Sequence, residues 1–228
     1  MICHQYVLLQ CVLLLCLVGP CFASETQQDT IVLRGDCKSI TKEGDMQFQD
    51  LLDKGVTFIP QGPPLAPQDI ARWETIINAP FPEQYRDYLL HANGGAMRIS
   101  PKHKESYDCY AFNITWPEGL RDRTPGSLLG KFFAIQDIPA EQAAHMLTFN
   151  YNYNAWKDVL PPNTFPIATD PGGAYLLIGL KGENRGKIYF WMLESANPMD
   201  TPEIAAYAYM GWVADSFVEF VLSLEYMD

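Results

Sequence analysis

The stretch Phe165-Pro-Ile-Ala-Thr-Asp-Pro-Gly-Gly-Ala-Tyr-Leu-Leu-Ile178 decides the fold of this 228-residue chain. Two short apolar runs flank a Thr-Asp-Pro-Gly-Gly turn, which is the pattern of a β-hairpin. Pro171 fits a backbone φ near −65°, and paired glycines supply the positive φ of tight turns, which we expect at Gly172. Asp170 can accept hydrogen bonds from the N–H groups of its own turn, so the motif has a structural explanation before any functional one.

Other apolar segments predict the rest of an antiparallel sheet. Residues 110–116 alternate between apolar and polar sides, as a half-buried strand does. Further strands are expected at residues 96–99, 132–138, 165–169, 175–180 and 187–193. A Gly-rich connection at residues 181–186 joins the last two as a hairpin.

Three amphipathic segments predict helices. Ile70, Trp73 and Ile77 recur at helical spacing, which indicates a helix over residues 68–78. A second helix begins at Pro82 and ends at Asn93-Gly-Gly95, a left-handed stop. A third is expected near the C-terminus, from the helical stripe Val213, Phe217, Phe220, Val221 and Leu224. The order helix, helix, strands, helix predicts an α+β fold, with a largely antiparallel sheet flanked by these helices.

The composition fits one domain with a sizeable core and an acidic surface. Apolar residues make up 48% of the chain, and Asp plus Glu outnumber Lys plus Arg by 27 to 16, which gives a net charge of −11. Direct nucleic-acid binding needs basic surface to displace counterions, so this charge argues against it. The excess of carboxylates would suit a basic protein partner, although solubility alone also explains it.

The first 23 residues contain no Asp, Glu, Lys or Arg. Their apolar run has the length of a secretory signal, and Cys21-Phe-Ala23 places small residues before a cut after Ala23. We therefore expect a cleaved leader at 1–23, a polar N-terminal extension at 24–66 that is loosely packed up to Thr57, and a folded domain at 67–228. The protein would then be periplasmic or secreted. The alternatives are an uncleaved membrane anchor, or a true start at Met46, which would make the protein cytoplasmic.

Two cysteines, Cys37 and Cys109, lie outside the leader. In an oxidising compartment they can form one disulfide, worth roughly 2–4 kcal/mol, and two unrelated thiols are the alternative. No metal site or cofactor is expected, because the chain has no Cys-x-x-Cys and its histidines share no ligand spacing.

Catalytic arrangements have weak support in the sequence. A Cys109 nucleophile with His91 or His103 would need a group that orients the histidine, and no local signature supplies one. Asp170 could instead share acid–base work with a second carboxylate, but turn capping and helix N-terminal positions account for all of these residues. The carboxylates available for such a pair are Glu83, Asp215 and Glu219.

Tyr151, Tyr153 and Trp156 stand among asparagines. This setting makes them the aromatic cluster best suited to an exposed contact surface, and burial in the core is the alternative.

Four motifs, taken in order, resemble the SUKH superfamily. Ile70-Ala-Arg-Trp-Glu74 followed by Phe81-Pro-Glu-Gln-Tyr-Arg-Asp-Tyr-Leu-Leu-His-Ala-Asn-Gly-Gly95 is similar to its entry helices and their Asn-Gly-Gly stop. Phe165-Pro-Ile-Ala-Thr-Asp-Pro-Gly-Gly173 resembles its central strand and turn. Lys187-Ile-Tyr-Phe-Trp191 is similar to the following strand, and Val213-Ala-Asp-Ser-Phe-Val-Glu-Phe220 to the last helix. The resemblance covers roughly residues 67–224.

This resemblance implies a non-enzymatic domain that works by binding a protein. Bacterial members commonly neutralise a cognate toxin, and fungal members regulate cell-wall assembly through protein contacts. We therefore expect an immunity protein that blocks a toxin by stoichiometric contact. An adaptor of envelope assembly is the alternative, and a hydrolase is the least favoured. The expected contact residues are Asp170, Gly172, Gly173, Asn93, Tyr151, Tyr153 and Trp156.

Overall fold

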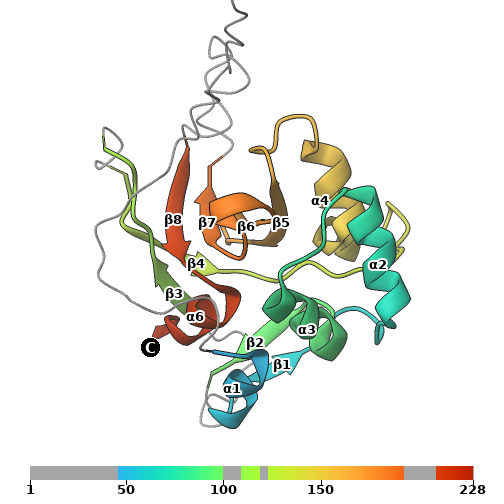
Figure 1. The fold of residues 1–228 in the computed structure, drawn as a ribbon, viewed down its shortest axis with the longest axis horizontal. Coiled ribbons are helices and arrows are strands. Elements are labelled where there is room, and N and C mark those ends of the chain that lie inside the picture. The colour runs from blue at the N-terminus through green and yellow to red at the C-terminus, as the bar shows by residue number, and fades with distance from the viewer. Residues whose placement is uncertain (1–45, 100–108, 119–122, 193–208, 228) are drawn as a thin grey trace, which may run out of the picture. The chain divides into compact units, whose positions relative to one another are not determined.

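A four-stranded antiparallel sheet forms the centre of the computed structural model (Figure 1). Its strands are β5 (Thr164–Thr169), β6 (Tyr175–Gly179), β7 (Ile188–Trp191) and β8 (Met210–Ala214), in that spatial order. All residues of β6 and β7 are buried, as expected where apolar side chains cover both faces of a sheet. The predicted hairpin is confirmed, with Phe165 opposite Ile178.

Two smaller antiparallel sheets adjoin the central one. One pairs β1 (Thr57–Ile59) with β2 (Ala96–Arg98), and the other has the order β4 (Gly126–Leu129), β3 (Cys109–Asn113), β9 (Glu225–Met227). Backbone hydrogen bonds connect the sheets: Phe132 exchanges two bonds of 2.9 Å with Gly95, and Thr115 exchanges bonds of 2.8 and 2.9 Å with Trp212. The predicted α+β class with antiparallel pairing is thereby confirmed.

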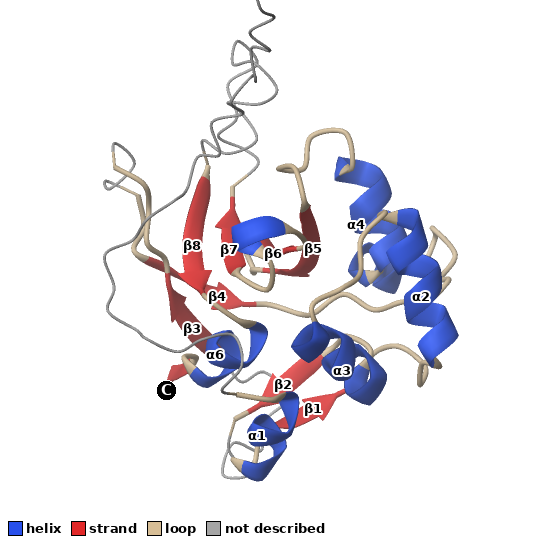
Figure 2. Cartoon of the chain, viewed as in Figure 1, coloured by secondary structure: helices blue, strands red, loops and turns tan. Residues whose placement is uncertain are grey.

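Helices pack around these sheets (Figure 2). They are α1 (Phe48–Asp53), α2 (Pro67–Ile76), α3 (Glu83–Ala92), α4 (Phe149–Trp156) and α6 (Phe217–Leu222), with 3-10 turns η1 (Ala143–Leu147) and η2 (Gly182–Asn184). Tyr88 of α3 and Phe217 of α6 lie 4.9 Å apart between ring centroids, inside a continuous aromatic core. Aromatic side chains carry large burial energies, so this core dominates the stability.

The structure describes residues 46–99, 109–118, 123–192 and 209–227. All of them belong to one compact unit, residues 33–228. The expected leader, most of the N-terminal extension, Cys37 and His103 lie outside the described residues. Within the described ranges, no helix has the length and apolar character needed to cross a membrane.

The prediction of a loosely packed segment up to Thr57 is wrong for residues 46–57. Phe48, Leu51 and Val56 are all buried, and Phe48 packs against the ring of Tyr88. Residues 48–53 form the six-residue helix α1, which presents only one or two apolar side chains inward, so its packing on the core leaves little signal in the sequence.

Two strand and helix assignments also differ from the sequence prediction. The expected strand at residues 132–138 makes only isolated bridges at Phe132 and Ala134. Val213, expected in the C-terminal helix, lies in β8, and α6 starts only at Phe217. The apolar run continues from strand into helix, and Ser216, whose side chain caps α6, marks the change.

Candidate functional site

Two elements on one face of the structure, the 3-10 turn η1 and the helix α4, are distinguished by their lack of charge. Residues 143–156, here called the uncharged segment, contain no Asp, Glu, Lys or Arg. Charged residues are depleted at the centres of protein interfaces, where Tyr and Met are enriched. Figure 1 shows α2 and α4 side by side beyond β5, so that the uncharged segment and α2 form one continuous face.

α4 is fixed on this face from its first residue. The Thr148 side chain accepts a hydrogen bond from the backbone N–H of Tyr151 (3.3 Å), which caps the helix. Asn152 is buried and donates to the carbonyls of Met146 and Thr148, both at 2.8 Å. Phe149 packs edge-on against Trp73 of α2, with ring centroids 5.3 Å apart. The surface that α4 presents is therefore rigidly held.

The predicted aromatic cluster is divided between this surface and the core. Tyr151 is 37% exposed, whereas Tyr153 stacks on Phe165 with ring centroids 5.8 Å apart. Trp156 is also partly buried and donates its Nε1–H to the Tyr175 hydroxyl at 2.7 Å. Met146, which the sequence prediction missed, is 56% exposed next to Tyr151 in the uncharged segment. Tyr151 and Met146 are thus its outward apolar groups.

A groove runs along the base of the same face. Its first part, about 350 Å³, lies between α2 and residues 135–137, and its second part, about 320 Å³, lies between residues 137–139 and the start of α4. Asp137 and Asn150 line both parts, and the Asn150 amide donates to Asp137 at 2.8 Å. We call this feature the α2 groove.

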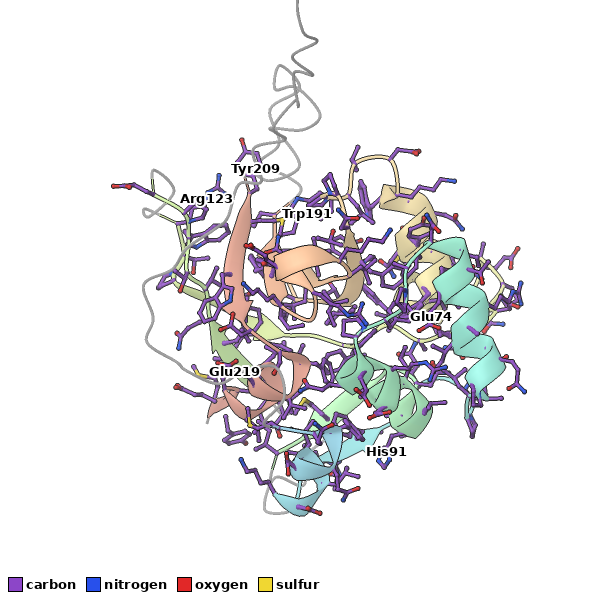
Figure 3. All side chains as sticks on the ribbon, in the orientation of Figure 1. Glu74, His91, Arg123, Trp191, Tyr209 and Glu219 are labelled. Atoms are coloured by element: carbon purple, nitrogen blue, oxygen red, sulfur yellow. The ribbon has the colours of Figure 1, made fainter. Side chains whose placement is uncertain are left out.

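α2 itself is tied to α3 on the other side. Glu74, between the two helices in Figure 3, accepts a hydrogen bond from the Phe81 N–H (3.0 Å) and pairs with Arg86 (3.5 Å). Trp73 and Ile70 of α2 are buried, as their helical spacing predicts. The groove wall therefore has little freedom to move.

Asn93, which we expected to contact a partner, instead connects two segments of the chain through its side chain. It is 1% exposed and takes the left-handed conformation (φ 44°, ψ 65°) at the end of α3. Its amide donates to the carbonyls of Pro63 (2.7 Å) and Ile135 (3.0 Å), and its Oδ1 accepts from the Ile135 N–H (2.7 Å). The Asn93 side chain holds both walls of the α2 groove together and leaves no group for a partner.

Asp170 is occupied by its turn. One carboxylate oxygen accepts from the Ala174 N–H and the other from the Ser127 hydroxyl of β4, both at 2.8 Å. The exposed turn residues Gly172 and Gly173 remain accessible to a partner. The positive φ that we expected at Gly172 occurs at Gly173 (φ 91°), because Asp170 and Pro171 already complete the first half of the turn.

The carboxylates proposed for hydrolysis serve structural roles here. Glu219 accepts from the Asp215 N–H at 3.2 Å at the start of α6, and Asp215 accepts from the Trp212 indole at 3.1 Å. Among the described residues, no group of His, Cys, Asp or Glu side chains is arranged to hold a metal ion. Cys109 opens β3 and is exposed, but Cys37 lies outside the described ranges, so their disulfide stays a prediction.

Burial raises the pKa of Glu219, and the neighbouring Asp215 charge raises it further, while the bond from the Asp215 N–H lowers it (Figure 3). A carboxyl with a raised pKa keeps its proton longer in the folded state than in the unfolded state, so stability falls as pH rises above the ordinary Glu value. Glu219→Gln should therefore gain stability relative to the wild type between pH 4 and pH 7. Urea unfolding of both proteins across this range measures the effect, and parallel pH profiles would contradict it.

Residues 64–223 match the SMI1 / KNR4 family (SUKH-1). This range contains α2, α3, α4, the central sheet and α6, together with all the sequence motifs that resemble the SUKH superfamily. A search among curated proteins found no match. Members of the matched family are generally non-enzymatic and interact with protein partners.

Proposed function

Because the chain belongs to the SMI1 / KNR4 family (SUKH-1), we propose that it is an immunity protein that neutralises a cognate toxin by stoichiometric contact through the α2–α4 face. The observation that carries the proposal is the uncharged segment, which presents Met146 from η1 and Tyr151 from the rigid helix α4 beside a groove. The partner is a protein with a basic surface, since the chain carries a net charge of −11. If the leader expected at residues 1–23 is functional, the partner acts outside the cytoplasm.

Co-expression with the toxin candidate encoded beside this chain tests the proposal. Growth should be rescued only when the protein is at least equimolar to the toxin, because blocking by contact consumes one molecule for each toxin. Asp170→Asn should preserve rescue, because no proton transfer is needed and the amide oxygen can still accept from the turn. Rescue far below equimolar amounts, or its loss in a folded Asp170→Asn protein, would instead indicate an enzyme.

Met146→Ala combined with Tyr151→Ala should weaken toxin binding by about 10–100-fold, since exposed apolar and aromatic anchors dominate interface energies. Unfolding stability should change little, because both side chains are largely outside the core. Met227→Ala on β9 is the matched control, since Met227 is 53% exposed against 56% for Met146. Titration calorimetry measures the toxin affinity of the wild type, the double variant and the Met227→Ala control. Equal losses of affinity in the two variants would place the interface elsewhere.

A further inference from the structure

The α2 groove contains a stretch of irregular backbone, residues 136–138, with unused hydrogen-bonding groups. Within the described part of the chain, the N–H groups of Gln136, Asp137 and Ile138 and the carbonyls of Gln136 and Asp137 make no hydrogen bond. The preceding residue, Ile135, is held in place, because both its N–H and its carbonyl are hydrogen-bonded to the Asn93 side chain. A held backbone with unpaired N–H and carbonyl groups offers the hydrogen bonds that an added strand needs.

Two carboxylates face the same groove with one oxygen each to spare. Asp69 uses one oxygen to accept from the Ala66 N–H (2.8 Å), and Asp137 uses one to accept from Asn150 (2.8 Å). The second oxygen of each accepts no hydrogen bond in the described residues. Arg72 is exposed on the α2 side, so the groove carries two negative charges against one positive. The net charge of the groove is negative, like that of the whole chain, and it favours a cationic ligand group.

The floor and rim of the groove supply apolar contacts. Trp73 forms part of the wall, and Ile76, at the end of α2, is 48% exposed. An apolar side chain in a strand two residues from a Lys or Arg would point to the same side as that cation, because strand side chains alternate.

We propose that the α2 groove binds an extended segment of the partner protein, which adds as a strand along residues 136–138. The segment places a Lys or Arg between Asp69 and Asp137 and an apolar side chain against Ile76. This inference rests on the proposed function and names the part of the partner that the α2–α4 face recognises.

Selection from a displayed library of random heptapeptides tests it. The full-length protein should enrich peptides with a Lys or Arg flanked by apolar residues, whereas the Asp69→Asn, Asp137→Asn double variant should bind those peptides at least tenfold more weakly. Asparagine keeps an acceptor oxygen at both positions, so the start of α2 and the Asn150 contact persist. Arg72→Gln is the opposite control and should not weaken binding.

Backbone pairing has its own readout. A synthetic copy of an enriched peptide, N-methylated at alternate residues, should lose binding, and the unmodified peptide should slow hydrogen exchange at residues 136–138. Enrichment of acidic peptides, no enrichment at all, unchanged binding by the double variant, or equal binding of the N-methylated peptide would overturn the inference. Toxin rescue without peptide binding would refute this inference alone, and peptide binding without rescue would refute only the proposed function.

Discussion

Replacing Asn93 with alanine is expected to lower the free energy of unfolding by about 3 kcal/mol, because three hydrogen bonds to Pro63 and Ile135 disappear inside the protein. The carbonyls of Pro63 and Ile135 and the Ile135 N–H, all partly buried, lose their partners. Alanine also tolerates the left-handed backbone of this position less well than asparagine. Urea unfolding at constant pH measures the loss.

Asn163→Ala separates the two causes. Asn163 has the same left-handed backbone (φ 58°) but is exposed, and its side chain makes no hydrogen bond within the described residues. Asn163→Ala should therefore lower the free energy of unfolding by only about 1 kcal/mol, which is the cost of placing alanine in the left-handed conformation. Similar losses for both variants would show that the internal bonds of Asn93 contribute little.

Gly95→Ala should destabilise by about 3–4 kcal/mol. Gly95 has a φ of 97°, and a Cβ there would overlap the carbonyl oxygen of Ile59, the backbone that pairs β1 with β2. A backbone neighbour cannot rotate away as a side chain can, so β1 must shift and carry α1 with it.

Gly173→Ala is the matched control, since its φ is 91° and the space around it is open. It should lose only about 1 kcal/mol, from the strain of a side chain at positive φ. Thermal or urea unfolding of both variants checks the contrast. A Gly95→Ala protein as stable as Gly173→Ala would show that the β1–β2 pair adapts at little cost.

The central hairpin and the entry helices were predictable because their periods are long or strict. Ile70, Trp73 and Ile77 recur at helical spacing over about two turns. Residues 165–168 and 175–178 are uninterrupted apolar runs around a Thr-Asp-Pro-Gly-Gly turn. β1 and β9, three residues each, have no period to detect, and their positions depend on partners far along the chain.

The site residues could be predicted only in part, because the rotation of a helix about its axis decides which of its side chains are exposed. Tyr151 and Tyr153 are two residues apart on α4, so they point in different directions, and packing against Trp73 and Phe165 turns Tyr153 inward. Met146 had no sequence signal, because a single methionine in an apolar run is usually core. The α2 groove lies between segments 70 residues apart, Pro64 to Leu65 and Ile135 to Asp137, which no local pattern brings together.

The position of α6 affects the order in which this chain can fold during synthesis. Phe217 touches Tyr85, Tyr88 and Phe132, and Phe220 touches Phe112, so rings from the last helix fill the gap between the first helices and the sheets. β9 pairs with β3 only when residues 225–227 have left the ribosome. Contacts between distant segments slow folding, because a long loop must close before they form. A nascent chain of this protein therefore lacks a closed core until α6 and β9 have both left the ribosome.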